Sequence, residues 1–335
     1  MSELSYLEKL LDGVEVEWSN LGNLCDIFTG GEAPQKHIKG DTPTSDYQYP
    51  IYGNGAEIYG YADSYRIGQD AVTISSIGAN TGTIYFRKAF FTPIIRLKVV
   101  IPKHSWLLPR YLFHYLSSQT INSKSSSVPN MNASDVKKLS IPIPCPNNPE
   151  KSLAIQSEIV RILDKFTALT AELTAELNMR KKQYNYYRDQ LLSFDNEDVP
   201  HLPMGQKDIG EFIRGGTFQK KDFMDAGVGC IHYGQIYTYY GTYTKKTKTH
   251  ISAALAKKCK KAQKGNLIIA TTSENDEDVC KAVAWLGSDD IAVSSDACIY
   301  KHNLNPKYVS YYFQTEQFQN QKRQYITGAK VRRVN

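Results

Sequence analysis

Several features of membrane, secreted and disulfide-linked proteins are missing from this sequence. It has no run of 18 apolar residues, and its first residues, MSELSYLEKLLDG, lack the basic and apolar regions of a signal peptide. We therefore expect neither a helical membrane span nor signal-peptide secretion. The cysteines lie far apart with no CxxC pair, which predicts neither a zinc site nor a dense disulfide framework. A reducing cytoplasm fits best for Cys25, Cys145, Cys230, Cys259, Cys280 and Cys298.

Catalytic motifs are also scarce. The glycine-rich stretch 78–82 lacks the lysine and the spacing of a phosphate-binding loop, and no GxGxxG sequence follows a predicted strand. No Asn/Asp-Pro-Pro-aromatic motif for methylating a base is present, and the seven histidines form no HxxxH pair. The acidic run Glu274–Asp278 is either a solvated loop or a metal site, but Val279 stands where a metal-dependent nuclease would have an acid two residues before Lys281. We expect no catalytic residue, no metal site and no cofactor in this chain by itself.

The balance of charge differs along the chain. With 335 residues, 41% of them apolar, the chain is long enough for two domains with cores of their own. The net charge is +6, and residues 201–335 contain 20 Lys and Arg against 12 Asp and Glu, while the rest is slightly acidic. A local basic surplus indicates a polyanionic partner such as nucleic acid, although a solvated lysine-rich face would give the same count.

The second half of the chain repeats motifs of the first half in the same order. Because the offset drifts from 181 to 203 residues, the repeat indicates duplication of a whole domain with insertions rather than a solenoid. Four pairs of stretches carry it: Tyr6–Leu11 with Tyr187–Leu192, Gly30-Gly31 with Gly215-Gly216, Pro109–Leu116 with Pro306–Phe313, and Val128–Asn132 with Val331–Asn335.

A single long helix is predicted between the two copies. Residues 150–194 contain neither proline nor glycine, and apolar residues recur at steps of four and three, the spacing of a coiled-coil seam. Two Thr-Ala-Glu-Leu repeats at 170–177 place two steps of four in succession. One apolar stripe on a helix this long requires a partner helix, and none is found within the chain. We expect the stripe to be an interface formed by Ile155, Ile159, Ile162, Phe166, Leu169, Leu173 and Leu177.

The rest of each copy mixes strands with a short helix. Apolar and β-branched residues bounded by Gly and Asn turns predict strands at Ala71–Ser75, Thr83–Phe86 and Ile94–Val100. A short helix closes each copy, at Pro109–Ser118 and at Pro306–Phe318. The predicted fold class is α+β, with two mixed α/β globules joined by a long coiled-coil helix.

Polar residues on turns recur at equivalent places in both copies. Arg, Lys, Asn, Gln, Ser and Thr side chains can contact base edges and phosphates, although turns are rich in such residues in any protein. Their recurrence favours DNA binding. The candidates are Gln35, Lys36, Ser75, Asn80, Thr81, Asn130 and Asn132 in the first copy, and Lys220, Lys221, Thr271, Ser273, Lys330, Arg332 and Arg333 in the second.

With these residues, the chain resembles the specificity subunit of type I restriction–modification systems, particularly that of the C family. The matching segments are Ser2–Trp18, Ile141–Pro144 and the helix Ser152–Phe194 with its Thr-Ala-Glu-Leu repeats. In that family a second long helix is expected after the second domain, but the sequence stops at Asn335, so this C-terminal helical region is lacking. The resemblance implies an N-terminal helical segment at 1–17, target-recognition domains at 18–145 and 199–335, and a spacer helix at 146–198.

The resemblance also implies a division of labour within a complex. Each globule would bind one half of a bipartite target in double-stranded DNA, and the helix would set the spacing and dock two modification (methyltransferase) subunits, with restriction subunits further out. S-adenosylmethionine, ATP and Mg²⁺ are then expected in the partner subunits, whose complex would be a DNA adenine methyltransferase and endonuclease. The unpaired helix would pair with a second copy, giving a homodimer, or with a modification subunit. The alternative is a non-enzymatic coiled-coil scaffold or dimerisation protein whose globules bind other proteins.

Overall fold

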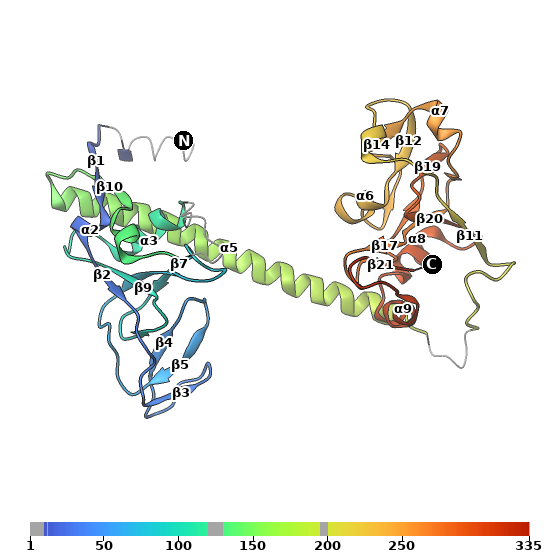
Figure 1. Ribbon diagram of the computed structural model, residues 1–335. Helices are drawn as coiled ribbons and strands as arrows, with labels where there is room; N and C mark the ends of the chain where they lie inside the picture. Colours follow the sequence, from blue (N-terminus) through green and yellow to red (C-terminus); the bar gives the residue numbers. More distant parts are fainter. Residues whose placement is uncertain (1–9, 12, 120–129, 195–199, 335) are drawn as a thin grey trace. The chain divides into compact units, whose positions relative to one another are not determined.

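The computed structural model describes residues 10–11, 13–119, 130–194 and 200–334 (Figure 1). The chain divides into two compact units, residues 1–174 (unit 1) and 175–335 (unit 2). Both units mix helices and strands, and the long helix α5 (Pro149–Leu191) contributes residues to each. This architecture confirms the predicted fold class. The finer division into four segments stays a prediction.

Unit 1 contains two four-stranded sheets and one strand pair. The first sheet has the order β2-β9-β6-β7, the second has the order β3-β5-β4-β8, and β1 pairs with β10. The strands are β1 (Val16–Asn20), β2 (Cys25–Thr29), β3 (His37–Lys39), β4 (Tyr49–Tyr52), β5 (Ile58–Ala62), β6 (Ala71–Ile74), β7 (Ile84–Arg87), β8 (Thr92–Pro93), β9 (Lys98–Pro102) and β10 (Ser140–Pro144). Besides α5, the described residues of this unit include the helices α2 (Leu21–Leu24), α3 (Pro109–Ser117) and α4 (Ala133–Lys137).

The main core of unit 1 lies between the first sheet and α3. Val72 and Val100 are paired on neighbouring strands and are fully buried, as is Leu112 of α3. The same core takes up part of the Ile159 side chain of α5, so the long helix packs directly on this unit. β-Branched residues suit such strands because their side chains pack well on a pleated, buried surface.

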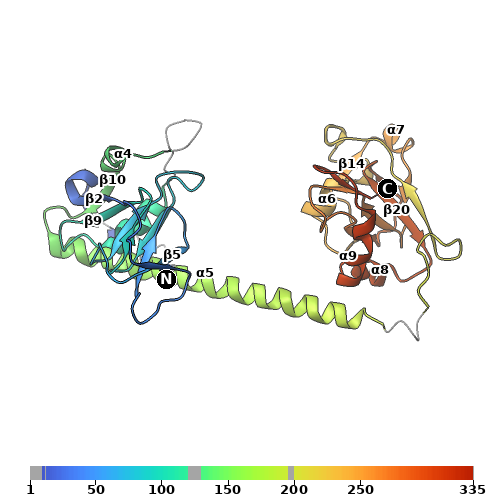
Figure 2. The ribbon, with the colours of Figure 1, turned by 60° about the horizontal axis from the view of Figure 1, so that its bottom comes forward.

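Unit 2 contains a five-stranded sheet, a four-stranded sheet and a short strand pair, β17 with β21. The sheet orders are β11-β20-β16-β18-β13 and β14-β12-β19-β15. The strands are β11 (Gly210–Arg214), β12 (Val228–Ile231), β13 (Tyr243–Thr244), β14 (Thr249–Ile251), β15 (Lys261–Ala262), β16 (Leu267–Ala270), β17 (Thr272–Ser273), β18 (Ala282–Trp285), β19 (Ile291–Val293), β20 (Ala297–His302) and β21 (Arg332–Arg333). The helices are α6 (Tyr233–Thr238), α7 (Ala253–Ala256), α8 (Pro306–Tyr312) and α9 (Glu316–Lys322), with 3₁₀ turns η1 (Lys220–Asp222) and η2 (Arg323–Tyr325). In Figures 1 and 2, α8 and α9 lie beside the last turns of α5.

The two units share the same core topology, which confirms the duplication that the sequence indicates. In unit 1, β4 pairs antiparallel with β5 and parallel with β8, and in unit 2, β12 pairs antiparallel with β14 and parallel with β19. The order β2-β9-β6-β7 corresponds to β11-β20-β16-β18.

The repeated glycine pair has a structural reason. The Gly30 N–H donates to the Leu97 carbonyl oxygen, as the Gly215 N–H does to that of Ala297. A Cβ atom at Gly30 would lie 2.8 Å from the Ile94 nitrogen, and one at Gly215 would lie 2.2 Å from the Ser294 oxygen. Only glycine allows the chain to pass this close to the neighbouring backbone.

Helix α5 is continuous from Pro149 to Leu191, within the predicted spacer of residues 146–198. The Asn148 side chain accepts the Lys151 N–H at 3.0 Å, which caps the helix, and proline at the first helical position suits a helix start. In the described part of the chain, no helix is long and apolar enough to span a membrane.

The predicted apolar stripe of α5 is covered at one end. Ile155 is only 4% exposed and Ile159 packs partly against the core of unit 1, so the expectation that all seven residues lack a partner within the chain is wrong for these two. From Phe166 onward the stripe is open, since Phe166, Leu169, Leu173 and Leu177 are between 46% and 57% exposed.

Three predicted elements differ in the structure. The strand expected at Ile94–Val100 begins only at Lys98, because Ile95 and Arg96 form a turn with φ of 52° and 58°. The helix expected at Pro306–Phe318 is two helices, and Thr315 caps the second by accepting the Phe318 N–H. Of the helical segment predicted at 1–17, residues 1–9 and 12 lie outside the described residues, and residues 16–17 begin strand β1.

Candidate nucleic-acid interface

In unit 1, predicted DNA-binding residues from distant parts of the sequence lie on adjoining segments. Ile77 and Asn130 form an antiparallel bridge, and the Met131 N–H donates to the Ser76 carbonyl oxygen at 2.8 Å. These contacts place the turn that carries Asn80 next to Asn130 and the residues that follow it. Asn80 and Asn130 are both exposed, so their side-chain amides are available to a partner.

Three of the predicted residues in unit 1 form hydrogen bonds within the protein. Ser75 has no exposed surface and its hydroxyl donates to the Asn54 carbonyl oxygen at 2.7 Å, so the prediction that this side chain contacts DNA does not hold in this structure. The Thr81 hydroxyl donates to the Gly78 carbonyl oxygen at 2.7 Å. Asn132 is exposed but precedes α4, and its N–H donates to the Asp135 carboxylate. Residue type predicted these positions, but type alone does not tell which hydroxyls point inward.

Gln35 and Lys36 belong to the other sheet of unit 1. They lie in the turn before β3, at the edge of the sheet β3-β5-β4-β8, and both side chains are exposed. They remain predicted contacts, on a different element from Asn80 and Asn130.

In unit 2, the structure brings the second set of candidates together through the pair β17 and β21. Thr272 pairs with Arg333 and Ser273 with Arg332, and the Val334 N–H donates to the Thr271 carbonyl oxygen at 3.1 Å. In unit 1, Met131 makes the same bond to Ser76, so the C-terminal residues of both copies dock on the same loop. The sequence alignment of Val128–Asn132 with Val331–Asn335 therefore agrees with the backbone contacts of the described residues.

The basic residues of this cluster differ in their surroundings. Lys330 and Arg333 are exposed, whereas the Arg332 Nε lies 2.7 Å from the Asp276 carboxylate, which already neutralises its charge. Ser273 is nearly buried and its hydroxyl accepts the Asn275 N–H, so it supports the loop that follows it.

The acidic run Glu274–Asp278 is held as a loop. The Asn275 side chain donates to the Asp278 carboxylate at 2.8 Å, and the ammonium group of the buried Lys322 donates to the carbonyl oxygens of Glu277 and Val279. In the part of the chain that the structure describes, no group of three or more His, Cys, Asp or Glu residues is arranged to hold a metal ion. Sequence reasoning missed Lys322, because a lysine near the end of a polar helix is typical of a solvated surface.

Lys220 and Lys221 are exposed in η1. Burial lowers the pKa of the His232 imidazole, and the positive charge of Lys220 lowers it further. His232 directly precedes α6, where the Tyr233 N–H donates to the Ser294 hydroxyl. Lys220 and Lys221 thus lie on a different element from Arg333, which is in β21.

Burial raises the pKa of five of the six cysteines. Burial raises the pKa of Cys25 and of Cys298 to about 12, and that of Cys280 to about 11. All six cysteines are free thiols in the structure. Because the thiolate is the reactive species, the raised pKa makes Cys25, Cys280 and Cys298 poor nucleophiles at neutral pH.

Unit 1 is fixed to α5 by buried polar contacts. The side chain of Gln156 accepts the Leu108 N–H and donates to the Trp106 carbonyl oxygen, both at 3.0 Å. Eight residues further on, about two turns of the helix, the Asp164 carboxylate accepts from the Arg110 Nε at 2.8 Å and lies 2.6 Å from the His114 Nε2. Burial raises the pKa of the Asp164 carboxyl, but hydrogen bonds from His114 and Arg110 outweigh this effect, so the pKa lies below its usual value.

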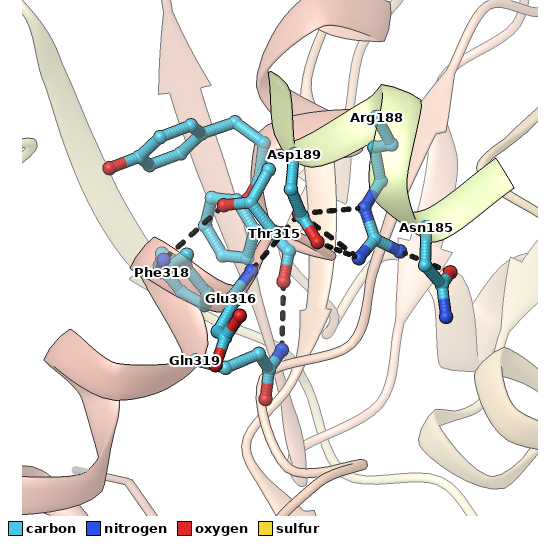
Figure 3. A network of polar contacts seen from close by, with 9 residues as sticks. Asn185, Arg188, Asp189, Thr315, Glu316, Phe318 and Gln319 are labelled. Atoms are coloured by element: carbon cyan, nitrogen blue, oxygen red, sulfur yellow. Dashed lines mark hydrogen bonds and ion pairs between the residues drawn. The ribbon is translucent and has the colours of Figure 1, made fainter. Parts of the chain in front are cut away.

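Unit 2 is fixed to the last turns of α5 in a similar way (Figure 3). Arg188 forms an ion pair with Asp189 at 3.0 Å, and the Asp189 carboxylate also accepts the N–H of Glu316 at the start of α9. A cavity of about 680 Å³ lies beside this network. It is lined by Arg180, Gln183, Tyr184, Tyr187, Arg188, Leu191, Leu192, Tyr308 and Tyr311. The apolar surface of α5 thus extends to its C-terminal turns.

Comparisons with known proteins agree with this arrangement. The chain is 45% identical over 227 residues to the specificity subunit of the type I restriction enzyme EcoR124I/EcoR124II of Escherichia coli, which covers 66% of this chain and 54% of that protein. It is 39% identical over 250 residues to the specificity subunit of the type I restriction enzyme EcoprrI of Escherichia coli, which covers 64% of this chain and 58% of that protein. The chain therefore spans little more than half the length of these relatives.

A solved structure has the same fold. The S subunit of a type I restriction–modification system from M. genitalium matches with a TM-score of 0.54 and 14% sequence identity, over 93% of this chain and 80% of that one. Membership of the C family stays a prediction. The model of the type I restriction modification DNA specificity domain matches residues 13–180, which is half of the chain, and the chain therefore belongs to this family.

Proposed function

We propose that this chain is the DNA-recognition subunit of a type I restriction–modification complex. The observation that carries the proposal is the match of residues 13–180 to a DNA specificity domain. The repeated topology supports it, because a second unit with the same core gives one chain two similar domains, as a bipartite target requires. Unit 1 would bind one half of the target and unit 2 the other half.

The contacts are expected to divide by chemistry. The exposed cations Lys220, Lys221, Lys330 and Arg333 suit phosphate oxygens, which are the main source of affinity for DNA. The exposed amides of Gln35, Asn80 and Asn130 and the partly exposed Thr271 suit base edges, where hydrogen bonds carry sequence information.

We further propose that the chain is not itself an enzyme. Methyl transfer and DNA cleavage would be performed by two modification subunits and by restriction subunits, which would bind S-adenosylmethionine, ATP and Mg²⁺. The raised pKa values of Cys25 and Cys280 and the hydrogen bond of Asn275 to Asp278 within the acidic loop support this division. A role in binding DNA would place the chain in the cytoplasm, as the sequence predicts.

The open part of the apolar stripe is the surface that we assign to a partner helix. Four large side chains, each about half exposed, follow one another on α5 from Phe166 to Leu177. Burying half of each against a helix from a modification subunit or from a second copy would contribute on the order of 1 kcal/mol per residue. Contiguous apolar patches of this kind are typical of interfaces.

Methylation with and without partners tests the recognition role. Expressed together with its modification subunits, the chain should direct adenine methylation to one bipartite sequence, visible by methylation-sensitive sequencing of the host genome. The purified chain with S-adenosylmethionine alone should transfer no methyl group. Methylation by the chain alone, or a partner complex whose methylation does not depend on this chain, would contradict the proposal.

A charge placed on the stripe tests the interface. Leu173→Glu should weaken binding of the modification subunit, or convert a dimer of the chain to a monomer, in sedimentation at micromolar concentration. Ala171→Glu introduces the same charge about 200° around the helix from Leu173, on the opposite face, and should leave association unchanged. Equal behaviour of the two variants would show that the stripe is not the interface.

A coiled-coil scaffold that binds only proteins is the less favoured alternative. A scaffold of this kind should not be retained on DNA at low salt. Phosphate contacts instead predict that the logarithm of the DNA-binding constant falls linearly with the logarithm of the salt concentration.

A further inference from the structure

The turn between β8 and β9 in unit 1 has an unusual backbone. Ile95 and Arg96 have φ of 52° and 58°, so two successive residues that are not glycine adopt the left-handed conformation. This conformation is rare for any side chain and is a true outlier for a β-branched one such as isoleucine. Residues in such regions persist only where the surrounding structure determines them, and they gather at functional sites.

Every backbone polar group of the two turn residues has a partner. The Ile95 N–H donates to the Gly31 carbonyl oxygen at 2.8 Å, and the Arg96 N–H donates to that of Gly30 at 3.0 Å. The Ile95 carbonyl oxygen accepts from the side-chain amide of Asn54. The buried Ser76 hydroxyl donates to the Arg96 carbonyl oxygen at 2.7 Å.

Asn54 connects this turn with the rest of the loops at this end of the first sheet. Its side-chain oxygen accepts the Ser76 N–H at 2.7 Å, and its carbonyl oxygen accepts from the buried Ser75. The following residues are held by Arg87, whose guanidinium donates to the carbonyl oxygens of Gly55 and Ala56. The Arg87 guanidinium itself stacks 3.8 Å from the centre of the Tyr52 ring.

This buried network holds a turn whose own side chains point outward. Ile95 is 48% exposed and Arg96 is exposed. Among the described residues, the Arg96 guanidinium forms no ion pair and no hydrogen bond. A structural turn would avoid an exposed isoleucine in a strained conformation, whereas a contact surface needs side chains held rigidly in that position.

The charge beside the turn favours an anionic partner. Lys98 is only 6% exposed, and the one partner of its ammonium group among the described residues is the Thr29 hydroxyl at 3.2 Å. Burial lowers the pKa of Lys98 and the neighbouring charge of Arg96 lowers it further, and among the described residues neither cation forms an ion pair. A positive site without a counter-ion attracts phosphate-rich molecules.

We propose that the Ile95–Arg96 turn is the element with which unit 1 recognises bases in DNA. Arg96 donates to the base edge of a guanine in the major groove, and Ile95 makes an apolar contact with a neighbouring base. Arginine to the O6 and N7 atoms of guanine is the commonest specific side-chain contact to DNA, and apolar side chains suit the methyl group of thymine. This inference rests on the proposed function and assigns residues that the analysis of turns in the sequence did not select.

The equivalent turn of unit 2 contacts its glycine pair in the same way, but Ser295 and Asp296 are not left-handed, and the turn has the opposite chemistry. Gly216 bridges to Ser294 as Gly31 does to Ile94, and the Thr271 N–H donates to the Asp296 carbonyl oxygen. Asp296 therefore stands where unit 1 has Arg96. An aspartate accepts hydrogen bonds, for example from the amino group of cytosine, whereas an arginine only donates them. Such a difference is expected if the two units read different half-sites through one shared turn.

The test uses the full chain assembled with its modification subunits, with the methylated sequence as the readout. Arg96→Ala should relax the requirement for one G·C pair in one half-site, lowering discrimination at that position about 10-fold to 100-fold, while the other half-site stays unchanged. Arg96→Lys should be intermediate, since lysine cannot make the same two-pronged contact. Ile95→Gly should alter the preference next to that position without lowering the thermal midpoint, because glycine adopts the left-handed conformation without strain.

Lys88→Ala is the matched control. It removes an exposed cation of unit 1 that already has a carboxylate partner, Asp70, at 3.0 Å, and it should leave the methylated sequence unchanged. If Arg96→Ala and Ile95→Gly left the methylated DNA sequence unchanged, or weakened binding to all DNA duplexes equally, the inference would be overturned and the proposed function would remain intact. If the complex with the wild-type chain methylated no bipartite DNA sequence, the proposed function would instead be rejected.

Discussion

Gln156 is the residue on which the attachment of α5 to unit 1 depends most directly. Its side chain has no exposed surface and makes three hydrogen bonds, to the Leu108 N–H, the Trp106 carbonyl oxygen and the Ser152 hydroxyl, each at 3.0 Å. Leu108 immediately precedes α3, the helix that packs on the first sheet. One amide thus connects the long helix with the start of the helix that covers the core.

Gln156→Met should destabilise unit 1. Methionine has nearly the same length and helix propensity as glutamine, so the change removes hydrogen bonds without disturbing α5. It leaves the Leu108 N–H and the Trp106 carbonyl oxygen buried without a partner. Each unpaired buried group costs about 1–3 kcal/mol, so the free energy of unfolding of unit 1 should fall by roughly 2–6 kcal/mol.

Urea unfolding together with peptide-resolved hydrogen exchange checks this prediction. Exchange should accelerate across the α3 region, residues 106–117, and stay unchanged in unit 2. Gln190→Met makes the same substitution at an exposed position of α5 and should alter stability by less than about 0.5 kcal/mol. If both variants lost equal stability, or if the loss appeared in unit 2, Gln156 would not be the connection that we describe.

Three further predictions concern the helix and the basic residues. Inserting one more Thr-Ala-Glu-Leu unit lengthens α5 by roughly 6 Å at about 1.5 Å per residue, so the gap between half-sites should grow by about one or two base pairs, while sequencing shows the same bases read. The folded-state pKa of Asp164 lies below its unfolded value, so the contribution of this carboxylate to stability is complete above about pH 5 and is lost on acidification. The Asp164→Asn variant should therefore lose less stability than the wild type between pH 7 and about pH 3, as measured by urea unfolding at each pH. Arg333→Ala should lower the slope of log affinity against log salt by about 1, and Arg332→Ala by less because Asp276 already neutralises it; equal slopes in salt titrations would contradict this.

The sequence predicts the large-scale architecture well because that architecture depends on local signals. The absence of proline and glycine over residues 150–194 leaves a helix as the best conformation, and α5 occupies most of that range. The repeated glycine pair identifies the duplication because Gly30 and Gly215 both pass too close to a neighbouring strand for any side chain.

The sequence fails where distant residues decide the local conformation. Ile94–Val100 has the composition of a strand, yet hydrogen bonds from Asn54 and Ser76 hold two of its residues in a turn. The apolar stripe shows which residues of α5 share a face, but only the structure shows that Ile155 is covered by unit 1 while Leu173 is open. Which surface covers a helix is a property of the whole fold.

A division of roles between backbone and side chains explains how one fold can bind two different half-sites. In both units, a main-chain bond from the glycine pair holds the residue directly after the turn: Gly30 to Leu97 in unit 1 and Gly215 to Ala297 in unit 2. These bonds involve backbone atoms and glycine, and not the side chains that the turn presents. Arg96 in one unit and Asp296 in the other therefore occupy equivalent places without any change in topology. A domain built in this way can alter the bases it contacts by substitution at the turn, while its core and its attachment to α5 stay the same.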